Sequence, residues 1–441
     1  MRIIRRLTPL RSIALGFILL ILLGALLLML PVSTRNGRVA SLTDALFTAT
    51  SACCVTGLVL RDTATYWSRF GQTVILLLIQ IGGLGFVTLA ATFFMLAKKR
   101  MGLRERELLT ESMSASRVQG IMDMARFAVL GTFFFEGIGA ALLAIRFIPR
   151  FGLGEGLYFS VFHSVSAFCN AGFDLMGVIE PYASFMPYMS DWLVNLTLMA
   201  LIFLGGIGFF VWDDVRKNGL HFKKYTLHAK LALFVSMILT LGGATLLFFY
   251  EPSNMPFGTR LLTSLFGSVT ARTAGFNTVD TAALSTGGKL TTMLLMFIGG
   301  SPASTAGGVK TTTIAVLIMY ATAGFRGEKH VNMFGRSVGD DTLKRAVLVV
   351  LTNFTVAFAG ALLICMTQQI PLSEVMFEVF SAIGTVGMST GITRELNGLS
   401  RYVIIFLMYL GRVGSISFAL ALLEKRVKPE VMQPVERVTI G

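Results

Sequence analysis

Charged side chains are scarce in this sequence. Asp, Glu, Lys and Arg make up 14% of its 441 residues, whereas 54% of the residues are hydrophobic, and the mean hydropathy is +0.72. Soluble globular domains carry about 25% charged residues, so this class of protein is excluded. No polar stretch is long enough for a soluble domain beside the apolar segments. The composition therefore predicts a polytopic membrane protein.

Cysteine and histidine are equally rare, with four of each. Cys53, Cys54, Cys169 and Cys365 show no disulfide pattern, and His163 has no Cys or carboxylate at ligand spacing, so packing is favoured over a metal centre. The first apolar run lacks an A-x-A cleavage site and is interpreted as a retained helix.

The net charge of +14 comes without a basic nucleic-acid-binding module. It indicates attraction to anionic membrane lipid and no nucleic-acid partner.

The apolar runs predict eight membrane-spanning helices, since each has about the 20 residues that a span requires. Glu136 and Arg412 are charges inside two of them. The expected spans are 12–32, 70–97, 127–145, 192–212, 231–250, 290–309, 346–373 and 402–423. Between successive pairs lie shorter apolar segments, 44–55, 156–169, 259–272 and 374–385. These are too short to cross and too apolar for ordinary loops, so they predict re-entrant helices.

The basic residues predict the orientation of the chain. If the N-terminus is inside, the inner segments hold 25 of the 38 Lys and Arg residues. These segments are 2–11, 98–126, 216–230, 326–345 and 425–437. Lys and Arg collect on the cytoplasmic side of membranes. We therefore expect a multi-pass membrane protein with both termini in the cytoplasm.

The same pattern occurs four times. The short segments read DALFTATSACCVTGL, GLYFSVFHSVSAFCNAGF, RLLTSLFGSVTARTAGF and EVMFEVFSAIGTVGM, and each contains one glycine after a short helix: Gly57, Gly172, Gly275 and Gly387. The following spans also match, with IQIGGLGF, IFLGGIGF, MFIGGSPA and MYLGRVGS. The sequence predicts an all-α fold of four tandem repeats, each a first span, a pore helix and a second span (M1-P-M2), around one pseudo-fourfold pore. The expected repeats are 1–100, 101–217, 218–326 and 327–441, the last with a C-terminal tail.

Four non-helical loops on one axis predict a cation filter. Backbone is non-helical at membrane depth only when it is buried or lines a watery cavity, and rings of carbonyl oxygens can replace the hydration shell of K⁺. Glycine permits the unusual backbone that such a ring requires. The pore helices point their partly negative C-terminal ends at the cation. The candidate ion-binding residues are Val55, Thr56, Gly57, Asn170, Ala171, Gly172, Thr273, Ala274, Gly275, Thr385, Val386 and Gly387.

These repeats, glycines and GGLGF-type motifs resemble the Trk/Ktr/HKT superfamily of potassium transporters, most closely its KtrB type of membrane subunit. The resemblance covers essentially the whole chain and implies a place in a bacterial plasma membrane. It implies one pseudo-tetrameric pore per subunit, a homodimer, and a cytoplasmic nucleotide-binding regulatory ring of the KtrA or TrkA type. The nucleotide would belong to that partner, and this chain would carry no cofactor. K⁺ would be the transported ion, with Na⁺ a candidate activator. Cys53 and Cys54 depart from the usual filter sequence and make thiol sensitivity an expectation.

The third repeat is interrupted by GGSPASTAGGVKTTT, residues 299–313. A Walker A loop is disfavoured because the order is GGVKTT and the flanking runs are apolar. In the resembling family this segment is an intramembrane gating loop. Arg412 stands where the other repeats have glycine, and its partner could be Glu136, an acidic pore-helix residue or a loop carbonyl, so a structural ion pair stays an alternative to gating. The candidate gate residues are Gly299, Gly300, Ser304, Thr305, Gly307, Gly308, Lys310 and Arg412.

A K⁺-uptake channel is the function that the sequence favours, and three alternatives to it are open. A secondary cation carrier with coupled alternating access also uses broken helices but expects two inverted repeats. A second alternative is a less selective pathway that conducts both K⁺ and Na⁺ through the same predicted pore. A membrane scaffold for a soluble enzyme leaves the four glycines unexplained, and no enzymatic activity is expected. Asp44, Glu374 and Glu378 either cap pore helices or attract cations to the entrance. The basic segments 98–117 and 216–230 are expected to dock the regulatory partner.

Overall fold

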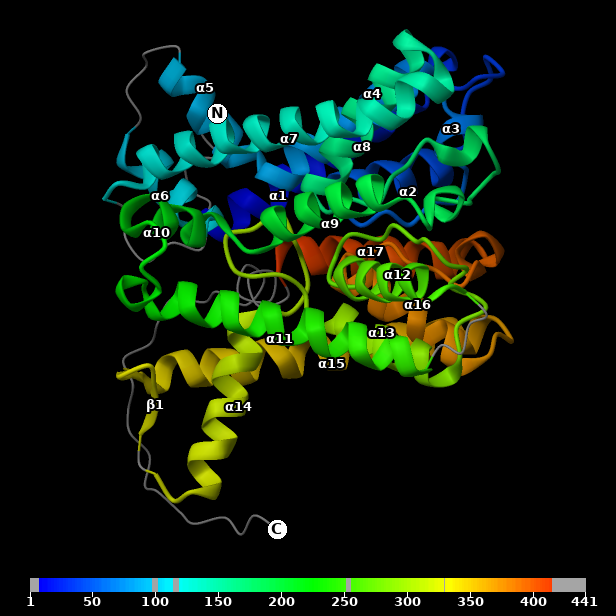
Figure 1. Cartoon of the computed structure of the whole chain (residues 1–441). Coiled ribbons are helices and arrows are strands. Elements are labelled where there is room, and N and C mark those ends of the chain that lie inside the picture. Colours follow the sequence, from blue (N-terminus) through cyan, green and yellow to red (C-terminus); the bar gives the residue numbers. More distant parts are fainter. Residues whose placement is uncertain (1–7, 97–101, 114–118, 251–254, 329, 415–441) are drawn as a thin grey trace.

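The computed structural model describes residues 8–96, 102–113, 119–250, 255–328 and 330–414. In Figure 1 the long helices α7 (Ile121–Phe151), α11 (Leu227–Tyr250) and α15 (Asp340–Thr367) run along one common direction. Helix α14 (Thr311–Phe325) crosses that direction and contacts a hairpin of β1 (Val331–Met333) and β2 (Arg336–Val338). The described part of the chain is therefore a helical bundle with one small antiparallel hairpin.

The remaining helices fall into a few kinds. The other long or bent elements are α1 (Pro9–Leu28), α4 (Arg69–Leu84), α5 (Phe86–Leu96), α9 (Trp192–Gly206), α10 (Phe209–Asn218), α13 (Thr286–Phe297) and α17 (Gly398–Val413). The short internal helices are α2 (Leu42–Cys53), α8 (Leu153–Phe168), α12 (Phe257–Thr270) and α16 (Leu372–Gly384). Peripheral pieces are α3 (Thr63–Tyr66), α6 (Leu103–Ser112) and the 3-10 turns Pro31–Ser33, Met176–Val178, Met186–Tyr188, Phe222–Lys224 and Ile392–Glu395.

Helices of membrane-spanning length occur throughout the described residues. Four of them, α1, α7, α11 and α15, are long and apolar enough to cross a bilayer, and the bent pairs α4–α5 and α9–α10 bring the number to six. The expected span 290–309 is divided between α13 and a loop, and the expected span 402–423 continues past Gly414, outside the described residues. The chain is a multi-pass membrane protein, and the number of eight spans stays a prediction.

Glycines bend two expected spans that the sequence predicts to be continuous. Between α4 and α5 the helix axis turns by 87° at Gly85, which has φ +79°, and between α9 and α10 it turns by 92° at Gly208, with φ +92°. A residue in this left-handed region cannot continue a right-handed α-helix. The predicted helices 70–97 and 192–212 are therefore each two helices that meet at a corner.

The core is centred on the four short helices. Each one packs against the long helix before it and the helix after it, as in α1–α2–α4 and α7–α8–α9. Contacts also pass from one such group to the next: α4 touches α8, α9 touches α12, α13 touches α16, and α17 touches α2. Fully buried side chains on the short helices form much of this packing, among them Phe47, Phe162, Phe168, Phe266 and Phe377. The packing thus closes into a ring of four groups.

The first and last described helices lie side by side. The hydroxyl of Tyr409 in α17 donates a hydrogen bond to the carbonyl of Ala14 in α1, at 2.9 Å. The start of α1 and the end of α17 are consequently at the same end of the bundle. Residues 1–7 and 415–441, including the basic segment 425–437, lie outside the described residues. So do 97–101 and 114–118, which contain part of the expected docking segment 98–117.

Candidate functional site

Four glycines meet at the centre of the bundle. Gly57, Gly172, Gly275 and Gly387 have φ of +95°, +68°, +84° and +96°. A Cβ added to any one of them would collide with the backbone of the next: Gly57 with Ala171 O, Gly172 with Ala274 O, Gly275 with Val386 O, and Gly387 with Thr56 O. Only glycine fits both the backbone conformation and this close approach. We call these four residues the glycine ring.

The residue two positions before each ring glycine is also left-handed. Val55, Asn170, Thr273 and Thr385 have φ of +51°, +57°, +101° and +51°. This conformation costs a residue with a side chain roughly 1–2 kcal/mol, and such strain is characteristic of functional sites. In an extended strand, neighbouring carbonyls point to opposite sides of the chain. Where left-handed and right-handed residues alternate, neighbouring carbonyls point toward the same side. These four positions are among the filter residues predicted from sequence, but nothing in the sequence indicates that their backbone is strained.

A buried hydroxyl fastens each of the four loops to its short helix. Ser51 Oγ accepts from Gly57 N–H and Ser381 Oγ accepts from Gly387 N–H, both at 3.0 Å. Ser166 Oγ donates to Phe173 O and Thr270 Oγ1 donates to Phe276 O, both at 2.7 Å. Ser51, Ser166 and Ser381 lie six residues before their ring glycines, and Thr270 lies five residues before Gly275. Sequence reasoning missed this role, although a Ser or Thr five or six residues before the glycine in all four segments was the available signal.

A cavity of about 310 Å³ lies on one side of the glycine ring, which forms part of its wall. Asp62, Asp174 and Asp280 line it together with Arg394. The Arg394 guanidinium lies over the ring of Tyr182, 4.3 Å from its centroid. Asp62 accepts the Tyr182 N–H at 3.0 Å. We call this space the outer cavity; its acidic side chains outnumber its one arginine.

The expected acidic residues near the short helices have different roles. Asp44 lies in the first turn of α2 and pairs with Arg61 at 3.1 Å. The hydrogen bond and charge of Asp44 raise the pKa of the half-exposed Arg61 side chain above its usual value. Glu374 lies in the first turn of α16, and the buried Glu378 accepts hydrogen bonds from Ser389 and Thr393. None of the three lines the outer cavity.

On the other side of the ring, residues 298–310 form a loop between α13 and α14. Its two ends pair through Gly299 N–H and Val309 O at 2.9 Å, with Ile298 and Val309 forming a parallel bridge. Ser301 N–H donates to Gly206 O at 2.9 Å and Thr305 N–H donates to Gly205 O at 3.2 Å. Residues 311–313, which the sequence assigns to the loop, form the first turn of α14. The 298–310 loop is thus attached to the corner of α9 and α10.

The 298–310 loop also lies directly against the residues below the glycine ring. Thr305 Oγ1 donates to Phe168 O at 3.0 Å and accepts from Asn170 Nδ2 at 2.8 Å. The side chain of Thr385 occupies the space that a Cβ on Gly307 would need. Gly308 similarly faces the backbone of Gly384. The loop, which belongs to the third group, therefore contacts segments of the second and fourth groups of the bundle.

Arg412 joins this loop to α4. Its Nη1 donates to Thr305 O, and its Nη2 donates to Gly82 O and, at 2.8 Å, to Gly83 O. Among the described residues Arg412 forms no ion pair. Glu136 instead accepts from Gln80 Nε2 at 3.3 Å. The sequence left three possible partners for Arg412: Glu136, an acidic pore-helix residue or a loop carbonyl. In the structure the partner from this set is a loop carbonyl, that of Thr305.

A second cavity of about 300 Å³ lies beneath the 298–310 loop. Arg412 and Lys310 line it, with Ser304, Gly308 and Glu111. Lys310 folds back onto the loop, where its Nζ donates to Ala306 O at 2.7 Å and to Gly307 O at 3.4 Å. We call this space the inner cavity. No residue that the structure describes lines both cavities, and the glycine ring and the loop lie between them.

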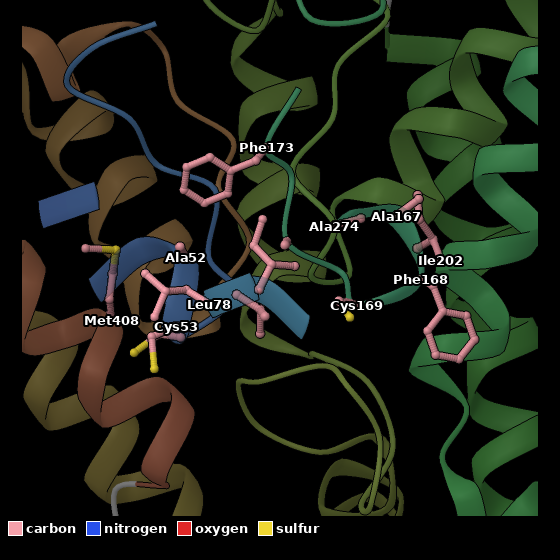
Figure 2. Close-up of a cluster of buried hydrophobic side chains, with 14 of the residues drawn as sticks. Ala52, Cys53, Leu78, Ala167, Phe168, Cys169, Phe173, Ile202, Ala274 and Met408 are labelled. Atoms are coloured by element: carbon pink, nitrogen blue, oxygen red, sulfur yellow. The ribbon is translucent and has the colours of Figure 1, made fainter. Parts of the chain in front are cut away.

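The thiols and His163 belong to the packing around the ring. Figure 2 shows Cys53 near Leu78 and Met408, and Cys169 beside the centre of the bundle. Cys53, Cys54 and Cys169 are free and fully buried. His163 uses both ring nitrogens, contacting Phe159 O at 2.7 Å and accepting Leu175 N–H at 3.0 Å. The described residues contain no cluster of three or more His, Cys, Asp or Glu side chains that could hold a metal.

Apolar spans packed around a ring of backbone loops, with a cavity on either side, define a membrane transport protein. Comparison with known proteins specifies the class. The family model TrkH, described as a cation transport protein, matches residues 12–428. The chain belongs to the TrkH family, whose members are transporters and not enzymes.

Several relatives share nearly the whole length of the chain. "Ktr system potassium uptake protein B" of Bacillus subtilis is 42% identical, with 94% of this chain and 92% of the relative covered. "Potassium/sodium uptake protein NtpJ" of Enterococcus hirae is 39% identical, with 100% and 99% covered. The crystal structure of the potassium transporter TrkH from Vibrio parahaemolyticus has a TM-score of 0.73 at 18% identity, covering 93% of this chain and 84% of that one. The last comparison establishes a shared fold.

Proposed function

We propose that this chain takes up K⁺ across the bacterial plasma membrane through a channel-like passage at the glycine ring. The observation that carries the proposal is the closed ring itself, in which four segments meet with two left-handed residues each. Near-full-length relatives are named potassium or potassium/sodium uptake proteins, and these names support the choice of ion. The architecture would be four M1-P-M2 repeats with eight spans around one pseudo-fourfold axis.

The filter would consist of backbone carbonyls of Val55, Thr56, Gly57 and their equivalents in the other three repeats. Carbonyl oxygens carry partial charge and replace the hydration shell of a large monovalent cation such as K⁺. Helices α2, α8, α12 and α16 all end within a few residues of the ring. Their partly negative C-terminal ends favour cations over anions there.

The gate would be the 298–310 loop held by Arg412. The loop lies between the ring and the inner cavity, and Arg412 ties it to α4. A fixed positive charge on the inner side of a cation path also opposes passage, since Coulomb terms are weakly screened away from water. Gly299, Gly300, Ser304, Thr305, Gly307, Gly308 and Lys310 would form the movable part.

The assembly would be a homodimer regulated by a cytoplasmic ring protein that binds the nucleotide. Support comes from the relatives named as proteins B of a Ktr system, a name that implies further components. Both termini would be cytoplasmic, in keeping with the adjacent ends of α1 and α17. Na⁺ would act as an activator and this chain would carry no cofactor.

Two other functions remain to be separated by experiment. The name of one relative as a potassium/sodium uptake protein favours a less selective K⁺/Na⁺ pathway as second candidate. A carrier with coupled alternating access predicts saturable flux in fixed stoichiometry with a second ion. Flux of K⁺ and of Na⁺, each measured alone in proteoliposomes holding the purified chain, distinguishes the three. K⁺ flux that needs no counter-ion and exceeds Na⁺ flux supports the proposal, and strictly coupled flux would overturn it.

A further inference from the structure

A third cavity, of about 230 Å³, lies between α11, α12, α13 and the segment 279–284. We call it the side cavity. Larger apolar side chains in its wall are those of Leu247, Met255, Val279 and Leu284. Asp280 and Met388 line both the side cavity and the outer cavity, so they separate the two spaces. Because Met388 directly follows the ring residue Gly387, a molecule in the side cavity would lie against the back of the fourth loop of the ring.

Several polar side chains of the side cavity already have hydrogen-bond partners within the chain. The hydroxyls of Thr263 and Thr292 donate to carbonyls of their own helices, at 3.0 and 2.8 Å. Asp280 accepts the N–H of Ala282 at 3.0 Å. These three groups therefore need no ligand in the cavity to satisfy them.

Arg260, which also lines the side cavity, is different because part of its guanidinium has no partner. Its Nη2 donates to Phe248 O, and the guanidinium lies over the Phe248 ring, 4.3 Å from the centroid. Its Nε is buried and has no hydrogen-bond partner in the described part of the chain. No ion pair among the described residues includes Arg260. Buried polar atoms nearly always have a partner, and an exception indicates an unseen ligand or water. The side cavity thus combines an apolar wall with a positive charge that these residues leave unpaired.

Exposed aromatic side chains surround the start of α12. Phe249 and Phe257 are 75% and 72% exposed. Trp192 is 47% exposed and lies beside Gly258, whose added Cβ would be 3.8 Å from its ring. Aromatic residues gather at the headgroup level of a bilayer. Arg260 lies in the first turn of α12, next to these aromatic residues, so we place it at the level of the lipid phosphates.

We propose that the side cavity binds an anionic phospholipid from the bilayer leaflet on the side of the outer cavity, with the lipid phosphate on Arg260 and an acyl chain along the apolar wall. This inference goes beyond the proposed function and does not depend on it. Pockets for whole small molecules measure about 300–1,000 Å³, so a space of about 230 Å³ suits one end of a longer molecule. The planar donors of arginine bind phosphate oxygens, and its unpaired charge favours a lipid with net negative charge. A lipid seated there would support Met388 beside Gly387, and transport would increase with it.

Binding of phosphatidylglycerol to the full chain tests the site. The lipid is added to the delipidated protein in detergent, and bound lipid is measured by native mass spectrometry. Arg260→Gln should weaken the tightest binding about tenfold, the effect of one lost bond to a charged group. Ala283→Trp, at an exposed position of the wall, should also weaken it by filling the opening while Arg260 stays. Arg150→Gln is the matched control, because the Arg150 guanidinium also lies over an aromatic ring, 5.0 Å from the centroid of Tyr188, but lines none of the three cavities.

Equal affinity in the unmodified chain and in Arg260→Gln, or an equal loss in Arg150→Gln, would overturn the inference. Soluble glycerol phosphate should leave the lipid in place, because it lacks the acyl chain that the apolar wall binds. Displacement of the lipid by glycerol phosphate would assign the cavity to a free phosphate compound and refute the lipid site.

K⁺ flux in vesicles of phosphatidylcholine, with and without phosphatidylglycerol, tests the effect on transport. Flux should rise with phosphatidylglycerol in the unmodified chain and in Arg150→Gln, but not in Arg260→Gln or Ala283→Trp. Thermal unfolding of the same preparations shows whether each variant is folded. A rise of equal size in all four proteins would refute the link between the side cavity and the ring. Absence of K⁺ flux from every vesicle would instead overturn the proposed function and leave the binding result as it is.

Discussion

Replacing Arg412 with alanine removes the guanidinium that joins the 298–310 loop to α4. One of its three hydrogen bonds reaches the loop, at Thr305 O, and two reach Gly82 and Gly83. A hydrogen bond from a charged donor contributes about 1.5–3 kcal/mol. The lower value corresponds to roughly a tenfold change in the ratio of closed to open loop. Backbone bonds to Gly205 and Gly206 keep the loop in place otherwise.

We expect Arg412→Ala to conduct K⁺ up to about tenfold faster than the unmodified chain and to depend less on a regulatory subunit. Its preference for K⁺ over Na⁺ should persist, because the glycine ring is unchanged. Arg412→Lys should be intermediate, since it keeps the charge and loses the fork of planar donors. The assay is K⁺ and Na⁺ flux in proteoliposomes, with thermal unfolding measured on the same preparations. Arg401→Ala, on the same helix α17, is the matched control and should conduct normally.

Slower flux from an Arg412→Ala protein that unfolds at the normal temperature would refute this reasoning. It would mean that Arg412 holds α4 and the loop in a conducting arrangement. A loss of both flux and thermal stability would assign Arg412 a structural role in joining α17 to α4. Either result would remove the gate from the account while leaving the filter.

Three further predictions concern the ring, its support and the partner. Gly57→Ser should lower the K⁺ to Na⁺ flux ratio, because a hydroxyl ligand favours the smaller ion and the Cβ presses on Ala171 O; an unchanged ratio in a folded protein would count against the filter. Ser381→Ala should cost about 1 kcal/mol of stability and broaden ion selectivity, since Gly387 N–H loses its acceptor; equal selectivity and melting temperature would contradict this. Membrane extracts should yield a soluble nucleotide-binding ring protein that changes the transport rate; full flux without nucleotide or partner would exclude it.

The short helices and the ring glycines could be predicted from sequence because repetition carries the information. Four segments with matching apolar patterns and one glycine in register indicate one structural unit repeated. The expected segment 44–55 compares with α2 at Leu42–Cys53, and 259–272 with α12 at Phe257–Thr270. Apolar length is a robust signal in a membrane, since the bilayer sets it.

Other features escaped prediction because they depend on contacts between distant segments. The left-handed conformation of Val55 and Thr385 is imposed by neighbouring segments, and neither residue type favours it. The bend at Gly208 follows partly from the 298–310 loop, since Phe209 N–H donates to Ala303 O at 2.7 Å. The sequence could not decide whether Arg412 binds an acidic side chain or a carbonyl. The charge of Arg412 suits both, and only the fold determines which of them lies close to it.

Selective flux through the purified chain tests the central claim most directly. The unmodified protein is reconstituted into liposomes, and initial uptake of K⁺, Rb⁺ and Na⁺ is compared at a fixed membrane potential without any counter-ion. A passage through the glycine ring predicts uncoupled uptake of K⁺ and Rb⁺ well above that of Na⁺. Equal uptake of all three ions, or K⁺ uptake in fixed stoichiometry with a second transported ion, would contradict it.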